Sequence, residues 1–161
     1  MRKIAAIAAA ALLFAACGAD GPTARPKLPD RFSNAPIEVR ARVPLPSCGE
    51  EKVAVFVGAN LEARRCFWSA YVASRPAEFI STQTTTEGDP ITWIYRVLPD
   101  RSVEVFLDQT KDKFSNGGWV RLACPGLSLI KGTPDQPDFG PGLGVGPGQE
   151  CDEDRLGVPN S

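Results

Sequence analysis

The sequence predicts an α+β domain in which one amphipathic helix packs on a mainly antiparallel sheet of four or five strands. Three observations lead to this prediction. Apolar residues recur with helical spacing in one segment, alternate with polar residues in several later segments, and give way to proline and glycine toward both ends. The length of 161 residues suits one domain of this kind with its appendages.

The first sixteen residues are typical of an export signal. Arg2 and Lys3 form a short positive region, and the 13 residues from Ile4 to Ala16 are all apolar or small. This run is too short to cross a bilayer as a helix, which takes about 20 residues, but it has the length of the apolar part of a secretory signal. We therefore predict that residues 1–16 are a removable signal peptide.

The residues at the expected cleavage point resemble the lipobox of bacterial lipoproteins. The chain reads Leu-Phe-Ala-Ala-Cys from Leu13 to Cys17. The resemblance implies that Cys17 receives a diacylglyceryl group and begins the mature chain. Membrane lipid would then be a partner through the acylated Cys17, holding the protein on the extracytoplasmic face of a membrane in the bacterial envelope. An ordinary secretory signal with an incidental cysteine is the alternative.

Residues 17–47 are expected to form a Pro-rich tether between the lipid anchor and the domain. Proline recurs along this stretch, and large apolar side chains are few. Because proline restricts the backbone and removes hydrogen-bond donors, we predict a partly extended, disordered segment. Residues 37–43 alternate apolar and charged side chains, so this part either pairs as an edge strand or stays unpaired.

The predicted domain covers residues 48–124, and its first elements are a strand and the helix. Residues 53–57 form an apolar, β-branched run that predicts a buried strand. Asn60 suits a helix N-cap, and the helix is expected to end before Pro76. The apolar stripe expected to face the sheet is Ala63, Cys66, Phe67, Ala70 and Tyr71. The residues expected to face away are Glu62, Arg64, Arg65 and Ser69.

The later segments predict strands and then a tail. Residues 79–86 are rich in β-branched and aromatic residues, and residues 119–123 form a last short strand. Residues 91–98 and 103–107 alternate apolar and polar side chains on either side of a short turn, so we predict that they pair as a hairpin. Residues 125–161 are rich in glycine and proline without a hydrophobic period, and this tail is expected to be disordered.

Four cysteines remain once Cys17 is set aside as the lipid-bearing residue. An even number in an exported chain predicts two disulfides, because extracytoplasmic compartments are oxidising. Four cysteines allow three pairings, and we favour Cys48–Cys66 with Cys124–Cys151. A catalytic thiol is the alternative, but the chain has no histidine to activate it.

Composition narrows the function classes further. The 18 basic and 19 acidic residues give a net charge of −1, so no basic excess is present to neutralise phosphates, and no nucleic-acid partner is expected. The absence of histidine excludes His-based catalytic triads and zinc sites that need an imidazole ligand. We expect no cofactor and assign no metal site.

Two loops carry the most distinctive motifs of the chain. Residues 86–91 read Thr-Glu-Gly-Asp-Pro-Ile, and residues 108–114 read Asp-Gln-Thr-Lys-Asp-Lys-Phe, with residues 119–124 following as the closing strand. In this order they resemble an uncharacterised family of small bacterial lipoprotein domains, over roughly residues 48–124. The resemblance implies a shared α+β domain and assigns no activity.

The same loops contain four acidic candidates for a site: Glu87, Asp89, Asp108 and Asp112. Turn chemistry is the favoured interpretation, because aspartate stabilises turns by hydrogen bonding to nearby backbone amides. Two alternatives stay open. If the loops meet, their carboxylates would suit Ca²⁺, which binds oxygen ligands. Asp108 and Asp112 would instead be the acid and base of a glycan hydrolase.

Trp68 lies beside the apolar stripe of the predicted helix. It is either an exposed contact for a partner or a residue packed beneath the tether. Taken together, the sequence predicts a lipid-anchored extracytoplasmic lipoprotein whose domain is a non-catalytic binding module for an envelope protein or glycan. A small envelope hydrolase that uses loop carboxylates and a cation-binding module are the alternatives.

Overall fold

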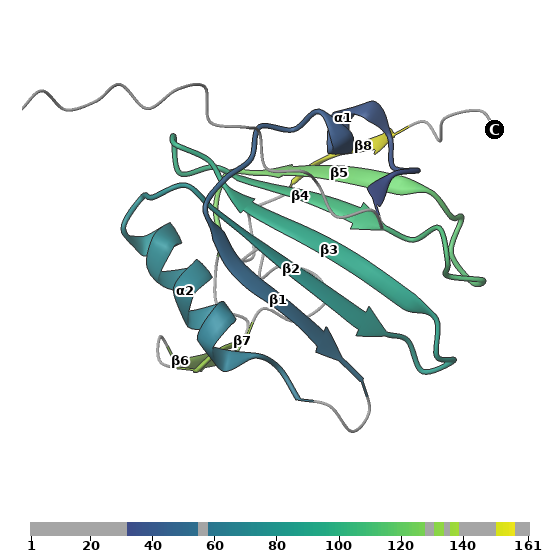
Figure 1. Cartoon of the computed structure of the whole chain (residues 1–161), viewed down its shortest axis with the longest axis horizontal. Helices are drawn as coiled ribbons and strands as arrows, with labels where there is room; N and C mark the ends of the chain where they lie inside the picture. Colours follow the sequence, from purple (N-terminus) through teal and green to yellow (C-terminus); the bar gives the residue numbers. More distant parts are fainter. Residues whose placement is uncertain (1–31, 55–57, 128–130, 134–135, 139–150, 157–161) are drawn as a thin grey trace, which may run out of the picture.

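The structure is a computed structural model that describes residues 32–54, 58–127, 131–133, 136–138 and 151–156. Its helices are α1 (Ile37–Arg40) and α2 (Leu61–Val72). Its strands are β1 (Ser47–Val53), β2 (Ala77–Thr84), β3 (Pro90–Val97), β4 (Val103–Asp108), β5 (Trp119–Cys124), β6 (Lys131–Thr133), β7 (Gln136–Asp138) and β8 (Asp152–Leu156). The main sheet has the order β1-β2-β3-β4-β5-β8, and β6 and β7 form a separate ribbon (Figure 1). The α+β class is confirmed, but the main sheet has six strands instead of four or five.

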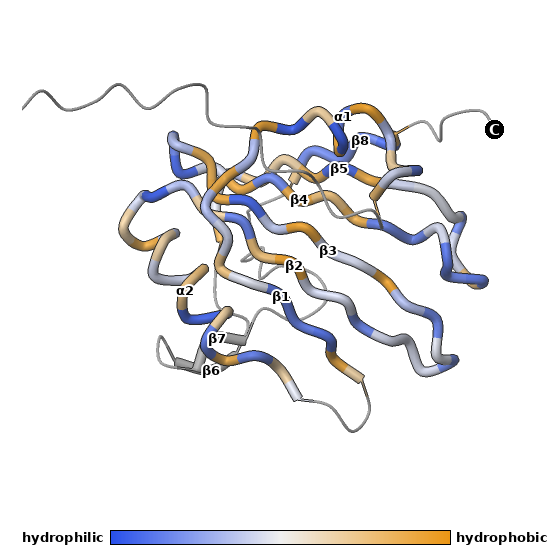
Figure 2. Tube along the Cα trace, in the orientation of Figure 1, coloured by the Kyte–Doolittle hydropathy of each residue, from blue (hydrophilic) through white to orange (hydrophobic). Residues whose placement is uncertain are grey.

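The strand directions follow from the connections between the strands. β1 runs parallel to β2, because α2 carries the chain back along the sheet between them, whereas the other neighbouring pairs are antiparallel. The predicted hairpin is present as β3 and β4, with Trp93 opposite Leu107 and Tyr95 opposite Val105. Every second residue of these strands is apolar and points to the α2 side of the sheet, whereas the residues between them are mostly polar, with Ile94 and Phe106 as exceptions (Figure 2).

The helix α2 starts where the sequence predicts. The Asn60 side chain accepts a hydrogen bond from the Ala63 N–H at 3.2 Å and caps the first turn. The prediction of a plainly amphipathic helix is wrong, however, because Arg64 is buried beside Phe67 instead of facing solvent. Cys66, which was expected to face the sheet, is exposed. The buried side of α2 therefore combines apolar residues with one charged residue.

The sheet carries a hydrophobic cluster on each face. The cluster on the α2 face joins Phe67 to aromatic and aliphatic residues of β2 to β5, among them Phe79 and Tyr95. The cluster on the opposite face, here called the α1 face, joins residues before and within α1 to the central strands. Its buried members are Phe32, Ala35, Val39, Ile80, Ile94, Phe106 and Trp119. Cover on both faces explains why β3 and β4 are buried along most of their length.

Residues 32–47 belong to the folded domain. The prediction of a disordered tether is wrong for this stretch, because Phe32 and Val39 are buried on the α1 face. The alternative of an edge strand at residues 37–43 is wrong as well, since residues 37–40 form α1. The domain therefore begins before Cys48, and its N-terminal segment is part of its core.

The C-terminal region also contributes to the sheet. β8 pairs antiparallel with β5, which places Asp154 opposite Arg121. The prediction of a disordered tail over residues 125–161 is therefore wrong for β8, and it is also wrong for Leu127, which is buried in the core, and for the β6–β7 ribbon. The β8 strand has no hydrophobic period that would reveal it in the sequence. Its position at the sheet edge comes from backbone pairing and from Cys151, which is bonded to Cys124 at the end of β5.

The first strand is more polar than the sequence suggests. We predicted a buried strand at residues 53–57, but β1 ends at Val53, and residues 55–57 lie outside the described residues. The buried side chain of β1 is Glu51, whose partner comes from α2. A buried ion pair thus takes the place of the expected apolar packing at this edge.

Both expected disulfides are present, as Cys48–Cys66 and Cys124–Cys151, which is the pairing that the sequence analysis favours. The first ties β1 to α2, and the second ties the C-terminal strand to the sheet. The expected signal peptide at residues 1–16, the lipidation residue Cys17 and the rest of the tether up to residue 31 lie outside the described residues. Among the described residues, no helix has the length and apolar character needed to cross a membrane.

Candidate binding groove

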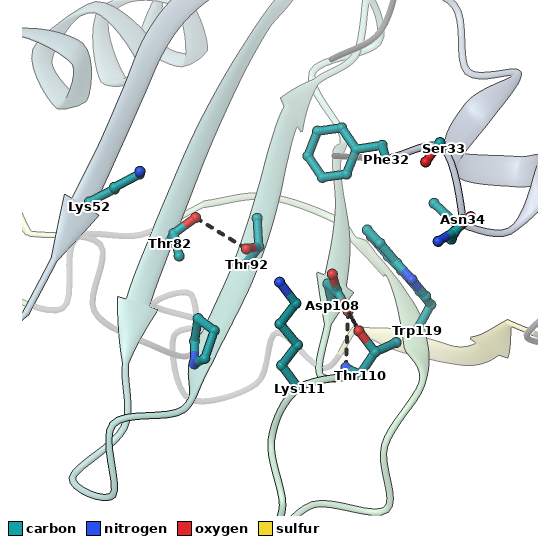
Figure 3. A pocket seen from close by; sticks show the side chains of 12 residues that line it. Phe32, Ser33, Asn34, Lys52, Thr82, Thr92, Asp108, Thr110, Lys111 and Trp119 are labelled. Carbon is teal, nitrogen blue, oxygen red and sulfur yellow. Dashed lines mark hydrogen bonds between the residues drawn. The ribbon is translucent and has the colours of Figure 1, made fainter. Parts of the chain in front are cut away.

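A groove of about 680 Å³ opens on the α1 face of the sheet (Figure 3). Its floor is one row of side chains that lie directly opposite one another on neighbouring strands. From β1 to β5 the row consists of Lys52, Thr82, Thr92, Asp108 and Trp119. Directly opposed residues of a sheet point to the same face. Strand register therefore assembles the floor from positions that are far apart in the sequence.

The sides of the groove come from segments next to the sheet. Residues 32–35, which lead into α1, form one side, and Thr110 and Lys111, which follow β4, form the other. Phe32 packs edge-on against Trp119, with ring centroids 6.1 Å apart. The groove therefore lies where the N-terminal segment stops covering the α1 face.

Hydrogen bonds order the polar floor (Figure 3). The hydroxyl oxygens of Thr82 and Thr92 lie 3.1 Å apart and share a hydrogen bond across β2 and β3. Asp108 Oδ1 accepts hydrogen bonds from the Thr110 N–H at 3.0 Å and from the Thr110 hydroxyl at 2.6 Å. These bonds fix the side-chain positions before any ligand arrives, and they occupy one of the two oxygens of the carboxylate in the groove.

Lys52 and Lys111 place two ammonium groups beside this floor. Figure 3 shows their side chains directed toward the groove from β1 and from the segment after β4. Both residues are exposed, and neither makes an ion pair within the described part of the chain. Lys113, two positions further along, is different because its ammonium lies 3.2 Å from Asp89. The groove thus combines hydroxyl groups, aromatic rings and two unpaired positive charges.

A ladder of alternating charges lies on the same face and supports one side of the groove. Its members are Arg42, Glu78, Arg96, Glu104, Arg121 and Asp154. Arg42 donates to both carboxylate oxygens of Glu78, at 2.8 and 3.0 Å, and its other nitrogen donates to the Val39 carbonyl. Because these charges satisfy one another, we assign the ladder a structural role. It attaches residues 32–42 to the sheet and so positions the groove.

The structure brings one of the four acidic candidates to the groove, and that residue is Asp108. Glu87 is exposed in its turn, and a hydrogen bond from the Thr86 hydroxyl lowers its pKa. Asp112 Oδ1 accepts a hydrogen bond from the Phe114 N–H at 2.9 Å. Within the described ranges, no three acidic or cysteine side chains gather in a way that could hold a metal ion. These contacts are those of turn chemistry.

Asp89 joins the two motif-bearing loops. Its Oδ2 accepts a hydrogen bond from the Lys113 N–H at 3.2 Å, and its Oδ1 lies 3.2 Å from the Lys113 ammonium. Mainly because of the backbone hydrogen bond, the pKa of Asp89 is lowered below its ordinary value of 3.8. The ionised form of Asp89 therefore stabilises the folded state.

We expect Asp89→Asn to make the domain less sensitive to acid. A lowered pKa in the folded state means that the stabilisation is present above pH 3.8 and is lost as the pH falls through the folded-state pKa. Urea unfolding of both proteins at neutral pH and at about pH 2 measures this difference. At neutral pH the wild-type protein should have a higher free energy of unfolding than Asp89→Asn, and this difference should shrink in acid. A gap that stays constant would contradict the assigned role.

Trp68 occupies a different part of the molecule from the groove. It is half-buried on α2, packs against the α2-face cluster, and lies beside Tyr71 with ring centroids 5.6 Å apart. Residues 32–39 of the expected tether pack on the opposite face of the sheet, so this part does not cover Trp68. Residues 17–31 lie outside the described residues, so packing of Trp68 beneath them stays a prediction. A role for Trp68 as a partner contact stays a prediction.

Most of the groove is not predictable from the sequence. Lys52, Thr82 and Thr92 lie on three strands, and nothing in the sequence shows that they are directly opposite one another. The usable signal was Thr92, a polar residue between the apolar Ile91 and Trp93 of β3. Lys111 gave no signal, because a lysine in a polar loop is ordinarily solvated.

Comparisons with known proteins do not identify a family for this chain. The chain matches no family model, no curated protein and no solved structure. The resemblance of its two loop motifs to small bacterial lipoprotein domains therefore stays a prediction. The functional assignment depends on the groove and on the export features of the sequence.

Proposed function

We propose that this chain is an extracytoplasmic lipoprotein of a bacterial envelope, anchored through the acylated Cys17, whose domain is a non-catalytic binding module. Its binding surface is the groove on the α1 face. The observation that carries the proposal is the ordered row of the groove floor, together with the ammonium groups of Lys52 and Lys111, which make no ion pair with any residue that the structure describes. Fixed polar groups in a concave site are typical of ligand recognition.

The use of the carboxylates supports binding over hydrolysis. Glycan hydrolysis needs two carboxyl groups on either side of the scissile bond. Of the loop carboxylates, Asp108 lies in the groove, where Thr110 occupies its Oδ1. The carboxylates of Asp89 and Asp112 hold backbone amides of the loop after β4. We therefore assign these groups to loop structure and assign ligand contact to the lysines and hydroxyls.

The export features support the proposed location. Residues 1–16 have the composition of a signal peptide, and small residues precede Cys17. The two disulfides suit an oxidising compartment outside the cytoplasm. A lipid anchor would keep the module at the membrane surface, within reach of the glycans and proteins of the envelope.

A Cys17→Ala variant of the full chain tests both parts of the proposal. In bacteria fed labelled palmitate, the wild-type protein should carry the label and fractionate with membranes, whereas the variant should be unlabelled and soluble outside the cytoplasm. A wild-type protein that is unlabelled and still begins at Met1 would contradict the anchor.

The soluble variant then reports on binding. Mixed with delipidated envelope material and centrifuged, Cys17→Ala protein should sediment with that material. Adding either Lys52→Gln or Lys111→Gln should shift the protein to the supernatant, whereas adding Lys113→Gln, which likewise removes one positive charge but outside the groove, should not. If the groove variants sedimented as much as the Lys113→Gln variant, or if the Cys17→Ala protein did not sediment at all, a binding role for the groove would be contradicted.

A further inference from the structure

The groove offers more hydrogen-bond donors than acceptors. The ammonium groups of Lys52 and Lys111 have three donors each and no acceptor. The charged acceptor among the groove residues is Asp108, and its Oδ1 already accepts two bonds from Thr110. No described carboxylate neutralises either ammonium group. A ligand that satisfies this site must therefore bring negatively charged oxygen atoms.

Between the two lysines, the floor matches a ligand that also carries hydroxyl groups. Thr82 and Thr92 present a pair of hydroxyls on β2 and β3, and each hydroxyl can both donate and accept. Phe32 and Trp119 border the adjoining part of the groove, but they are only 2% and 4% exposed, so the polar side chains form most of the surface that a ligand would meet. Hydroxyl groups are also the main substituents of a sugar ring. The volume of about 680 Å³ lies within the range of small-ligand sites.

The position of the groove argues against an extended peptide. Peptides commonly add to a sheet through backbone hydrogen bonds along an exposed edge. The groove reaches the edge strand β1 only through the side chain of Lys52, and the rest of its floor lies over β2 to β5, which are interior strands whose backbone groups already pair within the sheet. Recognition there must use side-chain hydroxyls and charges. These groups suit the substituents of a saccharide.

We propose that the groove binds an acidic saccharide, whose sugar rings carry carboxylate or phosphate groups that pair with Lys52 and Lys111. This inference rests on the proposed binding function and specifies its ligand class. Sugar hydroxyls would contact the Thr82–Thr92 pair. One charged group of the saccharide would lie at the β1 end of the floor, beside Lys52, and another at the side formed by the segment after β4, beside Lys111.

Calorimetry on the full-length chain in detergent tests the ligand class with three oligomers. A short oligogalacturonate supplies carboxylates, its fully methyl-esterified form is the neutral match, and a phosphorylated oligomannose supplies phosphates. We expect at least one acidic oligomer to bind, and the methyl ester to bind at least about tenfold more weakly, because charge-assisted contacts are lost. Affinity for the acidic oligomer should fall as salt is raised from about 50 to 500 mM.

Matched lysine variants assign the binding to the groove. Lys52→Gln and Lys111→Gln should each weaken binding of the acidic oligomer about tenfold, and Lys113→Gln should leave it unchanged. The three lysines are exposed, so unchanged melting temperatures would verify that the variants fold. Equal effects of Lys111→Gln and Lys113→Gln would overturn the inference.

The remaining outcomes separate the inference from the proposed function. The methyl ester could bind in the groove as tightly as the acid, or poly-glutamate could bind more tightly than any oligosaccharide. Either result would overturn the acidic saccharide as the ligand but would leave the protein a binding module. If the protein sedimented with envelope material but bound none of the three oligomers, the acidic saccharide would likewise be overturned and a binding module would remain. Loss of both sedimentation and oligomer binding would overturn the proposed function itself.

Discussion

Replacing Arg64 by methionine is expected to lower the free energy of unfolding by about 3–5 kcal/mol. Arg64 forms a two-point ion pair with Glu51, with Nε and Nη2 donating to its two carboxylate oxygens at 2.9 and 2.8 Å. The side chains are 7% and 1% exposed, respectively, so both charges are removed from water. The variant would leave the Glu51 carboxylate buried without a cation, and that is the costly state.

The size of the effect also reflects what else depends on Glu51. Its carboxylate accepts hydrogen bonds from the Ser81 hydroxyl at 2.7 Å and from the Asn60 N–H at 3.0 Å. Asn60 is the N-cap of α2, and Ser81 lies on β2, so one carboxylate joins β1, α2 and β2. Disturbing this joint should affect helix docking as well as local electrostatics.

Urea unfolding curves measure the loss, and two further variants identify its cause. Arg65→Met changes the neighbouring exposed arginine and should cost no more than about 0.5 kcal/mol. The double variant Glu51→Gln, Arg64→Met removes both charges and should recover more than about half of the loss, because the unpaired charge is the main penalty. If Arg64→Met and Arg65→Met had equal midpoints, the buried pair would have no such role.

Arg64 also shows where sequence reasoning fails in this fold. The start of α2 was predictable because Asn60 is a local cap, and its apolar stripe indicated a helix. The orientation of Arg64 was not predictable, because hydropathy assigns arginine to solvent. Its partner Glu51 precedes it on another element, and only the packing of α2 on β1 brings the two together.

The same distinction between local and long-range information applies to the sheet and the groove. The β3–β4 hairpin was predictable, since apolar residues alternate along both strands and a short turn joins them. β8 was not, because its placement depends on Cys151 and on pairing with β5. The groove depends on register across five strands, from Lys52 to Trp119. No local pattern in the sequence specifies that register.

Phe32→Ala is expected to have an equally large effect, about 3–5 kcal/mol, although the sequence placed this residue in a disordered tether. The Phe32 side chain is 2% exposed, packs edge-on against Trp119, and lies 5.6 Å from the Arg42 guanidinium, measured to the ring centroid. Truncation would leave a cavity in the smaller of the two clusters. Few other apolar side chains hold residues 32–42 on the sheet, so the segment should loosen as a unit.

Phe114→Ala provides the matched control, because it removes the same side chain from a position that is 77% exposed. Its free energy of unfolding, measured in urea, should stay within about 0.5 kcal/mol of the wild-type value, whereas that of Phe32→Ala should fall by several times as much. Limited proteolysis should also cut the Phe32→Ala protein sooner within residues 32–42. If the two variants unfolded at the same urea concentration, this segment would be a tether after all. The groove would then lose the side that Phe32 provides, because that side exists only while the segment stays packed on the sheet.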